Sequence, residues 1–274
     1  MLAATWLLPL AGGYDSAYRL LHLLTPVARG CPASSGTLIP STAPSSHVDV
    51  GFCETLLPKV RQCVAYSFGV GGVWDFDKAM AARNCRVRSF DPICCGGSHI
   101  IGPAHEFVPL SLSIYDGLVA PSAATGNATA SGLTLKSLVT GFGDRLDLLR
   151  MSVRLPNALE PACVPRLIKP RGSSRSEAAV DGCAQVSSKY EWKVLRSLTD
   201  SPALLKSVPQ LLLNLHLSDP TSFDLYADVL GDLKASGFVP FYVARQPTAE
   251  YLQIQEGTKQ LWSRWEVSMG NTRR

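Results

Sequence analysis

Residues 66–77, with the sequence YSFGVGGVWDFD, place three glycines directly behind an apolar run that predicts a buried strand. Gly69, Gly71 and Gly72 lack side chains, so a ligand can approach the backbone of this turn closely. Asp91 lies 22 residues beyond Gly69 (91 minus 69), at the end of the next predicted strand. An acid at that position binds ribose hydroxyls in nucleotide-type α/β folds. The spacing therefore predicts a cofactor with a nucleoside part.

Two other interpretations of these residues stay open. The glycine turn could serve only to bend the chain, with Asp91 beginning a turn before Pro92. A nicotinamide oxidoreductase is the weaker alternative, because the third glycine of the strict G-x-G-x-x-G pattern is missing.

Cysteine and histidine spacing indicates no metal site. The eight cysteines include no C-x-x-C pair and no histidine at zinc-finger spacing. Adjacent cysteines rarely bind one metal ion together, so we expect Cys94 and Cys95 to be thiols. His99 and His105 have no acid partner at a recognisable metal spacing. Disulfides are expected only if the chain enters the secretory pathway.

Composition limits the class of protein. A chain of 274 residues that is 46% hydrophobic can bury a large core, so global disorder is excluded. The formal net charge of +4 comes from scattered basic residues that form no stripe with interleaved aromatics. No nucleic-acid partner is expected.

Strand-like and helix-like segments alternate along most of the chain, which predicts βαβ units. The predicted strands are 62–68, 85–91, 106–114, 145–153, 209–217, 238–245 and 260–268, and the predicted helices are 75–84, 134–143, 190–200, 201–208 and 222–237. These elements predict an α/β fold with an open, mostly parallel sheet and helices on both faces.

Residues 1–55 are predicted to form an N-terminal extension ahead of a domain at 56–274. The extension contains a helical pattern at 14–28 and a loop rich in proline and serine at 30–47. Its first residues, MLAATWLLPLAGG, are either a signal peptide or membrane anchor, or an ordinary buried start. The sequon at Asn127 is compatible with secretion. These features favour a secretory or membrane-anchored location, with a cytoplasmic one as the alternative.

Residues 154–189 interrupt the alternation with four prolines and no sustained period, which predicts a long loop. One hypothesis is an insertion into a formerly continuous motif, translated from a retained intron or a wrong exon boundary. The alternative is a genuine loop that covers the pocket.

Several ordered motifs resemble one family. The segment CVAYSFGVGGVWDFDKAMAARNCRVRSFDP is similar to the first cofactor motif of the methyltransferase-like 24 group, relatives of the FkbM-type S-adenosylmethionine-dependent methyltransferases. The segments LSLSIYDG, TLKSLV, LDLLRMSV, YEWKVLRSL and QLLLNLHL follow that family's order, and the Trp-rich last strand is similar to its C-terminus. The resemblance covers residues 50–274 apart from 154–189.

The resemblance implies a class I methyltransferase fold, which is Rossmann-like, and S-adenosylmethionine as cofactor. It implies methylation, chiefly of oxygen, of a small molecule, glycan or protein that the sequence does not identify. The cofactor-binding residues it implies are Ser67, Gly69 and Gly71 beside the methionine part, Asp91 on the ribose, and Asp116 and Gly117 near the adenine.

His216, on the predicted strand LLLNLHL, is the candidate catalytic base for a hydroxyl acceptor. The alternative is a histidine that a neighbouring group satisfies in the core or at a sheet edge. Ser152 and Asn214 stand where the family has acids, and the family's Glu-Gly after the strand is missing. Two function classes follow: an active or impaired methyltransferase, and a non-catalytic binding module with the same fold.

Overall fold

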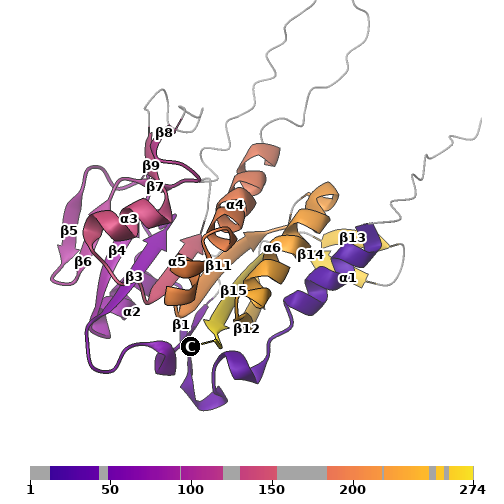
Figure 1. Ribbon diagram of the computed structural model, residues 1–274, viewed down its shortest axis with the longest axis horizontal. Helices are drawn as coiled ribbons and strands as arrows, with labels where there is room; N and C mark the ends of the chain where they lie inside the picture. The colour runs from indigo at the N-terminus through magenta and orange to yellow at the C-terminus, as the bar shows by residue number, and fades with distance from the viewer. Residues whose placement is uncertain are drawn as a thin grey trace, which may run out of the picture.

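The computed structural model describes residues 13–42, 49–92, 94–119, 130–152, 184–217, 219–246, 251–255 and 259–273. Its centre is an eight-stranded sheet with the order β12-β15-β11-β10-β3-β4-β6-β5 (Figure 1). These strands are β3 (Cys63–Phe68), β4 (Cys85–Phe90), β5 (His99–Gly102), β6 (His105–Val108), β10 (Leu148–Ser152), β11 (Gln210–His216), β12 (Phe238–Arg245) and β15 (Arg264–Asn271).

The sheet is mostly parallel. β3 pairs in parallel with both β4 and β10, β4 continues to β6, and β10 continues to β11. β15 runs antiparallel between β11 and β12, and β5 is antiparallel to β6. The predicted α/β class with a mostly parallel sheet is confirmed at this level.

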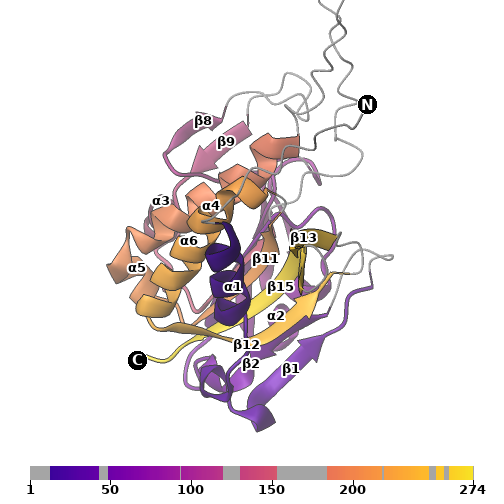
Figure 2. The same cartoon turned by 90° about the vertical axis from the view of Figure 1, so that its right-hand side faces the viewer.

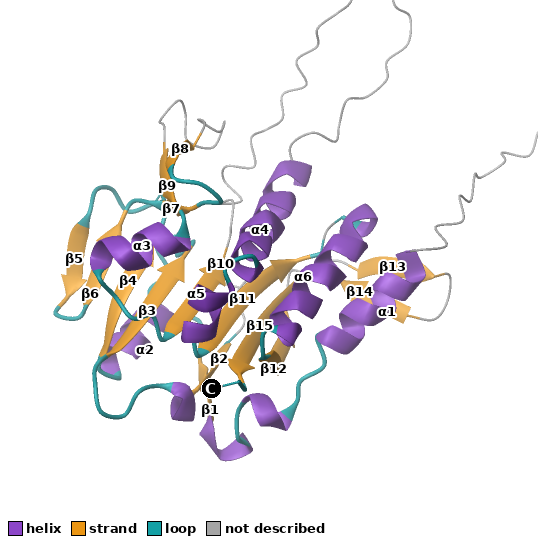
Figure 3. Ribbon diagram, viewed as in Figure 1, coloured by secondary structure: helices purple, strands orange, loops and turns teal. Residues whose placement is uncertain are grey.

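Helices cover the two faces of the sheet unequally. One face carries α1 (Gly13–Leu23), α3 (Leu135–Phe142), α4 (Ala184–Thr199), α5 (Pro202–Ser207) and α6 (Phe223–Ala235). The other face carries α2 (Asp75–Ala82) and the hairpin of β1 (Gly36–Ile39) and β2 (Val50–Cys53). Figure 2 shows the two layers on opposite sides of the sheet, and Figure 3 shows the same elements by type.

Burial explains why the central strands consist mainly of apolar residues. Every residue of β3 and of β10 is buried, because both faces of these strands are covered. Polar residues inside such strands need partners in the protein, and Asp147 illustrates this before β10. Its carboxylate accepts hydrogen bonds from the Val64 backbone N–H at 3.0 Å and from the Arg61 guanidinium at 2.8 Å.

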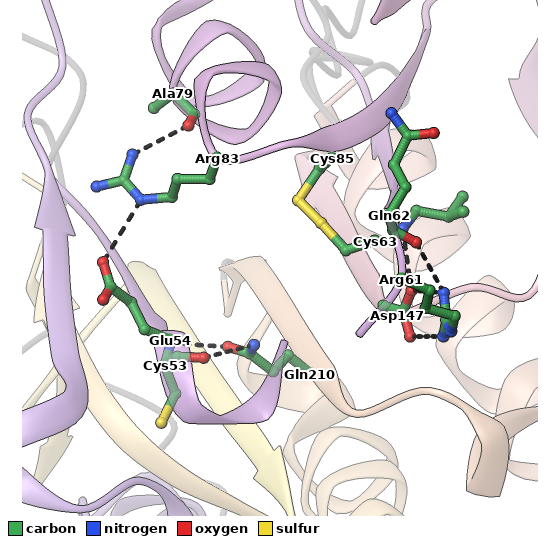
Figure 4. The surroundings of a disulfide bond; sticks show 11 residues. Cys53, Glu54, Arg61, Gln62, Cys63, Ala79, Arg83, Cys85, Asp147 and Gln210 are labelled. Carbon is green, nitrogen blue, oxygen red and sulfur yellow. Dashed lines mark hydrogen bonds and ion pairs between the residues drawn. A yellow bond between two sulfur atoms is a disulfide. The ribbon is translucent and has the colours of Figure 1, made fainter. Parts of the chain in front are cut away.

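The N-terminal elements pack against this sheet. The side-chain amide of Gln210 on β11 donates to the Cys53 carbonyl and accepts from the Cys53 N–H, both at 2.8 Å (Figure 4). Ser268 on β15 donates to the Gly51 carbonyl at 2.6 Å. α1 lies along α6, where Arg19 and Asp228 form an ion pair at 2.8 Å. The described part of the predicted extension thus belongs to the packed body.

Several element boundaries differ from the sequence-based prediction. The run at 106–114 splits into β6 and β7 (Ser111–Leu112) around Pro109, which has no N–H to donate to a sheet. The last predicted strand splits at Ser263 into β14 (Lys259–Trp262) and β15. α4 begins at Ala184, ahead of the predicted start at residue 190, so 184–189 is helical rather than loop.

The remaining short elements were not predicted as separate units. They are β8 (Gly117–Val119), β9 (Ala130–Leu133), β13 (Tyr251–Gln255) and the 3-10 helices Ala28–Gly30, Ala33–Ser35, Glu54–Leu56 and Pro220–Ser222. β7, β9 and β8 form a small sheet, and β13 pairs with β14. Residues 1–12, the sequon at Asn127 and segment 154–183 lie outside the described residues. Among the residues described, no helix combines the length and apolar character that crossing a membrane requires.

Three disulfides join cysteines of the described chain. Cys31 is bonded to Cys53 and Cys63 to Cys85, each pair 22 residues apart, and Cys94 is bonded to its neighbour Cys95. The expectation that Cys94 and Cys95 are thiols is therefore wrong. The Cys63–Cys85 bond joins residues that face each other in the parallel register of β3 and β4 (Figure 4).

We predict that replacing Cys63 and Cys85 together by alanine lowers the free energy of unfolding by about 3 kcal/mol, because the bond closes a loop of 22 residues in the unfolded chain. Denaturant unfolding under non-reducing conditions measures this change. Unchanged stability of the double variant would contradict a bond between these residues.

Candidate functional site

The glycine turn follows β3 at the carboxyl edge of the sheet. Gly69, Gly71 and Gly72 have φ angles of 71°, 55° and 77°, a region that residues with a side chain rarely adopt. The Gly69 N–H donates to the Phe90 carbonyl at 2.9 Å, which fixes the turn to the end of β4. A Cβ atom added at Gly71 would meet nothing within 4 Å. The backbone here is exposed to an incoming ligand.

Asp91 meets this turn. One oxygen of its carboxylate, Oδ2, accepts the Gly71 N–H at 3.0 Å, and the other, Oδ1, accepts the Cys94 N–H at 3.0 Å. The structure thus brings the predicted turn and the predicted acid together, on the ends of adjacent strands.

This contact lies where the strand order changes direction. From β3 the chain proceeds outward through β4 and β6, and it then returns to add β10 and β11 on the other side of β3. In open α/β sheets, ligands bind outside the carboxyl ends of the strands at such a switch point. The glycine turn therefore lies at the expected position of a ligand site.

Asp116 and Gly117 lie at the start of the small sheet, and both are exposed. The Asp116 carboxylate accepts the Thr134 N–H at 2.7 Å and the Ser137 hydroxyl at 2.6 Å, at the beginning of α3. These bonds lower the pKa of Asp116, with the Ser137 bond as the largest cause. The structure gives Asp116 a role in holding the loop to α3.

His216 ends β11 and contacts a buried acid that the sequence-based prediction missed. The Nδ1 atom of His216 lies 2.8 Å from Oε2 of Glu191, whose side chain is 2% exposed. The Trp192 indole N–H donates to the His216 carbonyl at 2.9 Å. An ionised Glu191 accepts a hydrogen from Nδ1, which leaves Nε2 as the ring's acceptor. The only sequence signal for Glu191 was its place in the YEWKVL motif.

The electrostatics of Glu191 follow from its burial. Burial raises the pKa of the Glu191 carboxyl, and the neighbouring His216 opposes that shift. The second oxygen, Oε1, has no hydrogen-bond partner among the described residues. A carboxylate that is buried with a histidine as its partner orients that ring, as the acid does in acid–base–nucleophile arrangements.

Ser152 and Asn214 are neighbours in the register of β10 and β11. Both are buried, and the Asn214 amide donates to the Ser152 hydroxyl at 3.5 Å, a long hydrogen bond. Glu266 on β15 stands opposite Asn214 and is 3% exposed. Ser152, Asn214 and Glu266 thus lie side by side on neighbouring strands, so a carboxylate is present beside the two neutral residues. The sequence did not predict that β15 would place Glu266 there.

Ser67 lies in a second polar row, on the face beneath α2. It is fully buried and accepts a hydrogen bond from Nη1 of Arg150 at 3.4 Å. Ser89, its neighbour on β4, donates to Asp77 at 2.7 Å, and Nε2 of His105 lies 2.7 Å from the same hydroxyl. Ser67 therefore lies below the glycine turn, and its hydroxyl already has a partner.

The described residues contain no group of three or more His, Cys, Asp or Glu side chains placed to hold a metal ion. His105 is bonded to Ser89, and burial lowers its pKa. His99, on the neighbouring strand β5, lies with Nδ1 2.7 Å from the Gly97 carbonyl.

No family model matches the sequence, and no curated protein matches it.

We predict that the free energy of unfolding falls as pH rises from the ordinary carboxyl range through the raised pKa of Glu191. In this interval the unfolded state has lost a proton that the folded state still holds, so the slope reaches at most about 1.4 kcal/mol per pH unit. Glu191→Gln should remove this part of the dependence in denaturant titrations at several pH values. Asp232→Asn, in an exposed ion pair with Arg196, is the matched control and should retain it. An unchanged slope in Glu191→Gln would contradict the assignment.

Proposed function

We propose that the chain is an S-adenosylmethionine-dependent methyltransferase acting on a hydroxyl or carboxyl group of a small molecule, glycan or protein. The observation that carries the proposal is the hydrogen bond between Gly71 and Asp91, because it joins a glycine turn and an acid on adjacent strand ends at the switch point. The ordered motifs that resemble the methyltransferase-like 24 group support S-adenosylmethionine as the nucleoside cofactor.

The strand order supports this proposal. An antiparallel strand inserted between the last two parallel strands is the arrangement of the class I methyltransferase fold that the resemblance implies. Here β15 takes that place between β11 and β12. Fold alone does not determine activity, so the site residues carry the functional argument.

The residues at the turn fit the cofactor. The space beside Gly71 is open to a ligand, because a Cβ atom added there would meet nothing within 4 Å. Asp91 is suited to accept ribose hydroxyls, because it is a carboxylate at the end of β4. Gly69 and Gly71 would lie beside the methionine part.

The cofactor supplies a methyl group on a positively charged sulfur atom. The chain contributes alignment of the acceptor and exclusion of water, which are the main sources of rate in such a transfer. His216 accepts the proton of an acceptor hydroxyl at Nε2, while Glu191 holds the ring through Nδ1 and stabilises its charged form. The acceptor would then bind near the ends of β10 and β11, where Ser152 and His216 lie.

A second candidate function is a binding module that keeps the fold without catalysis. The observation in its favour is that neutral Ser152 and Asn214 occupy family acid positions and are bonded to each other. Cofactor binding is expected under both candidates, whereas methyl transfer is expected only under the first.

We predict that the purified chain binds S-adenosylmethionine and that Asp91→Ala weakens binding about 100-fold or more, through loss of two charge-assisted hydrogen bonds to the ribose. Isothermal titration calorimetry measures both affinities. Asp232→Ala, on the surface of α6, is the control and should bind as the wild type does. Binding of reduced nicotinamide dinucleotide in place of S-adenosylmethionine would support the oxidoreductase alternative and contradict the proposal.

We predict that Ser152→Asp raises methyl transfer above the wild-type level, because it restores an acid beside Asn214. The measurement is incorporation of labelled methyl groups into mixed small-molecule, glycan and protein acceptors. Adding His216→Gln to this variant should return incorporation to background. If neither the wild type nor Ser152→Asp transfers methyl groups while both bind the cofactor, the binding module is the correct candidate.

A further inference from the structure

Arg150 carries a buried charge that the proposed function does not use. It lies in the middle of β10, is 8% exposed, and its Nε atom has no hydrogen-bond partner among the described residues. Burying a cation without full compensation costs free energy, and natural structures pair such a group with an anion or a set of acceptors. An unmatched guanidinium donor therefore points to an anionic partner.

The surroundings of Arg150 offer incomplete compensation. Its Nη1 donates to the Ser67 hydroxyl, and its guanidinium lies over the Phe76 ring, 5.1 Å from the ring centre. Asp77 is the carboxylate of this polar row, but its Oδ1 accepts from Ser89 and it forms no ion pair with Arg150. Its Oδ2 is likewise without a partner among the described residues. Arg150 is thus bonded to Ser67 on β3, and Asp77 to Ser89, the neighbour of Ser67 on β4.

The place of the guanidinium connects it with the glycine turn. Ser67 precedes the turn on β3, and Phe76 follows it in the first turn of α2. Arg150 contacts both, so its guanidinium lies under the chain segment that makes the turn. An anion held there would lie beside Gly69 and Gly71, where the methionine part of the cofactor is expected.

The geometry points to Arg150 as the residue that binds the carboxylate of the cofactor's amino-acid part. A guanidinium presents its Nε and Nη hydrogens as a planar fork that matches the two oxygens of a carboxylate. The contact would satisfy the unmatched Nε donor and neutralise the buried charge. This inference rests on the proposed function, because it assumes that the ligand of the turn is S-adenosylmethionine or its product.

The test compares two ligands that differ only in this carboxylate: S-adenosylhomocysteine and its decarboxylated analogue. Isothermal titration calorimetry of the full chain gives the ratio of their affinities. We expect the wild type to favour S-adenosylhomocysteine about 30-fold or more, the loss typical of removing one partner of a buried charged pair. Arg150→Met, which keeps volume and removes charge, should bind both ligands alike. Arg150→Lys keeps the charge but not the planar fork, so its affinity ratio should lie between those of the wild type and Arg150→Met.

The outcomes separate this inference from the proposed function. If the wild type binds both ligands equally, the role of Arg150 is wrong and the proposed cofactor site stands. The same conclusion follows if a folded Arg150→Met variant still prefers S-adenosylhomocysteine to its decarboxylated analogue. Binding of neither ligand overturns the proposed function together with the inference. If thermal unfolding shows that Arg150→Met is not folded, the wild-type ratio and Arg150→Lys still decide the question.

Discussion

The parallel pairing of β3 with both β4 and β10 is the constraint on which the rest of the molecule depends. It makes β3 the strand from which the chain departs in two directions, so three strand ends meet at one edge of the sheet. The glycine turn, Asp91 and Ser152 lie at this edge because each directly follows or ends one of these strands. Because both faces of these strands are buried, their polar residues form hydrogen bonds within the protein. Ser67 and Asn214 therefore each belong to a row of bonded polar side chains that crosses neighbouring strands.

Much of this architecture could be predicted from local pattern. Strands buried on both faces have mainly apolar sequences, and helices buried along one stripe have apolar residues at helical spacing. The sequence therefore predicts the strands β3, β10 and β11 and the helices α2, α3 and α6. β1 and β2 were not predicted, because they lie in and beside a segment rich in proline and serine that is typical of a loop. The contacts that hold them are a hydrogen bond from the distant residue Gln210 and the disulfide between Cys31 and Cys53, and local sequence pattern predicts neither. The order in which β15 enters the sheet depends likewise on long-range pairing.

The site divides in the same way. Gly71 and Asp91 were predictable because a turn and an acid at the ends of successive strands must lie close together when the strands pair in parallel. The sequence did not predict Glu191, Glu266 or Arg150 as site residues, because their contacts depend on which strands and helices pack side by side. His216 gives the clearest example: the residue was identifiable on its strand, whereas the acid that orients it comes from a helix on a different part of the chain. Buried polar residues within apolar segments are the signal that could have singled them out.

The position of β15 between β11 and β12 has a consequence for protein synthesis. β12 precedes β15 in the chain, but it is bonded to the rest of the main sheet through β15. While the chain leaves the ribosome, β3, β4, β10 and β11 can pair in turn, whereas β12 has to wait with an unpaired edge until β15 emerges. A nascent chain arrested between these two strands would expose that edge and the flank of β11, which makes it a substrate for chaperones and a candidate for pairing with a second chain.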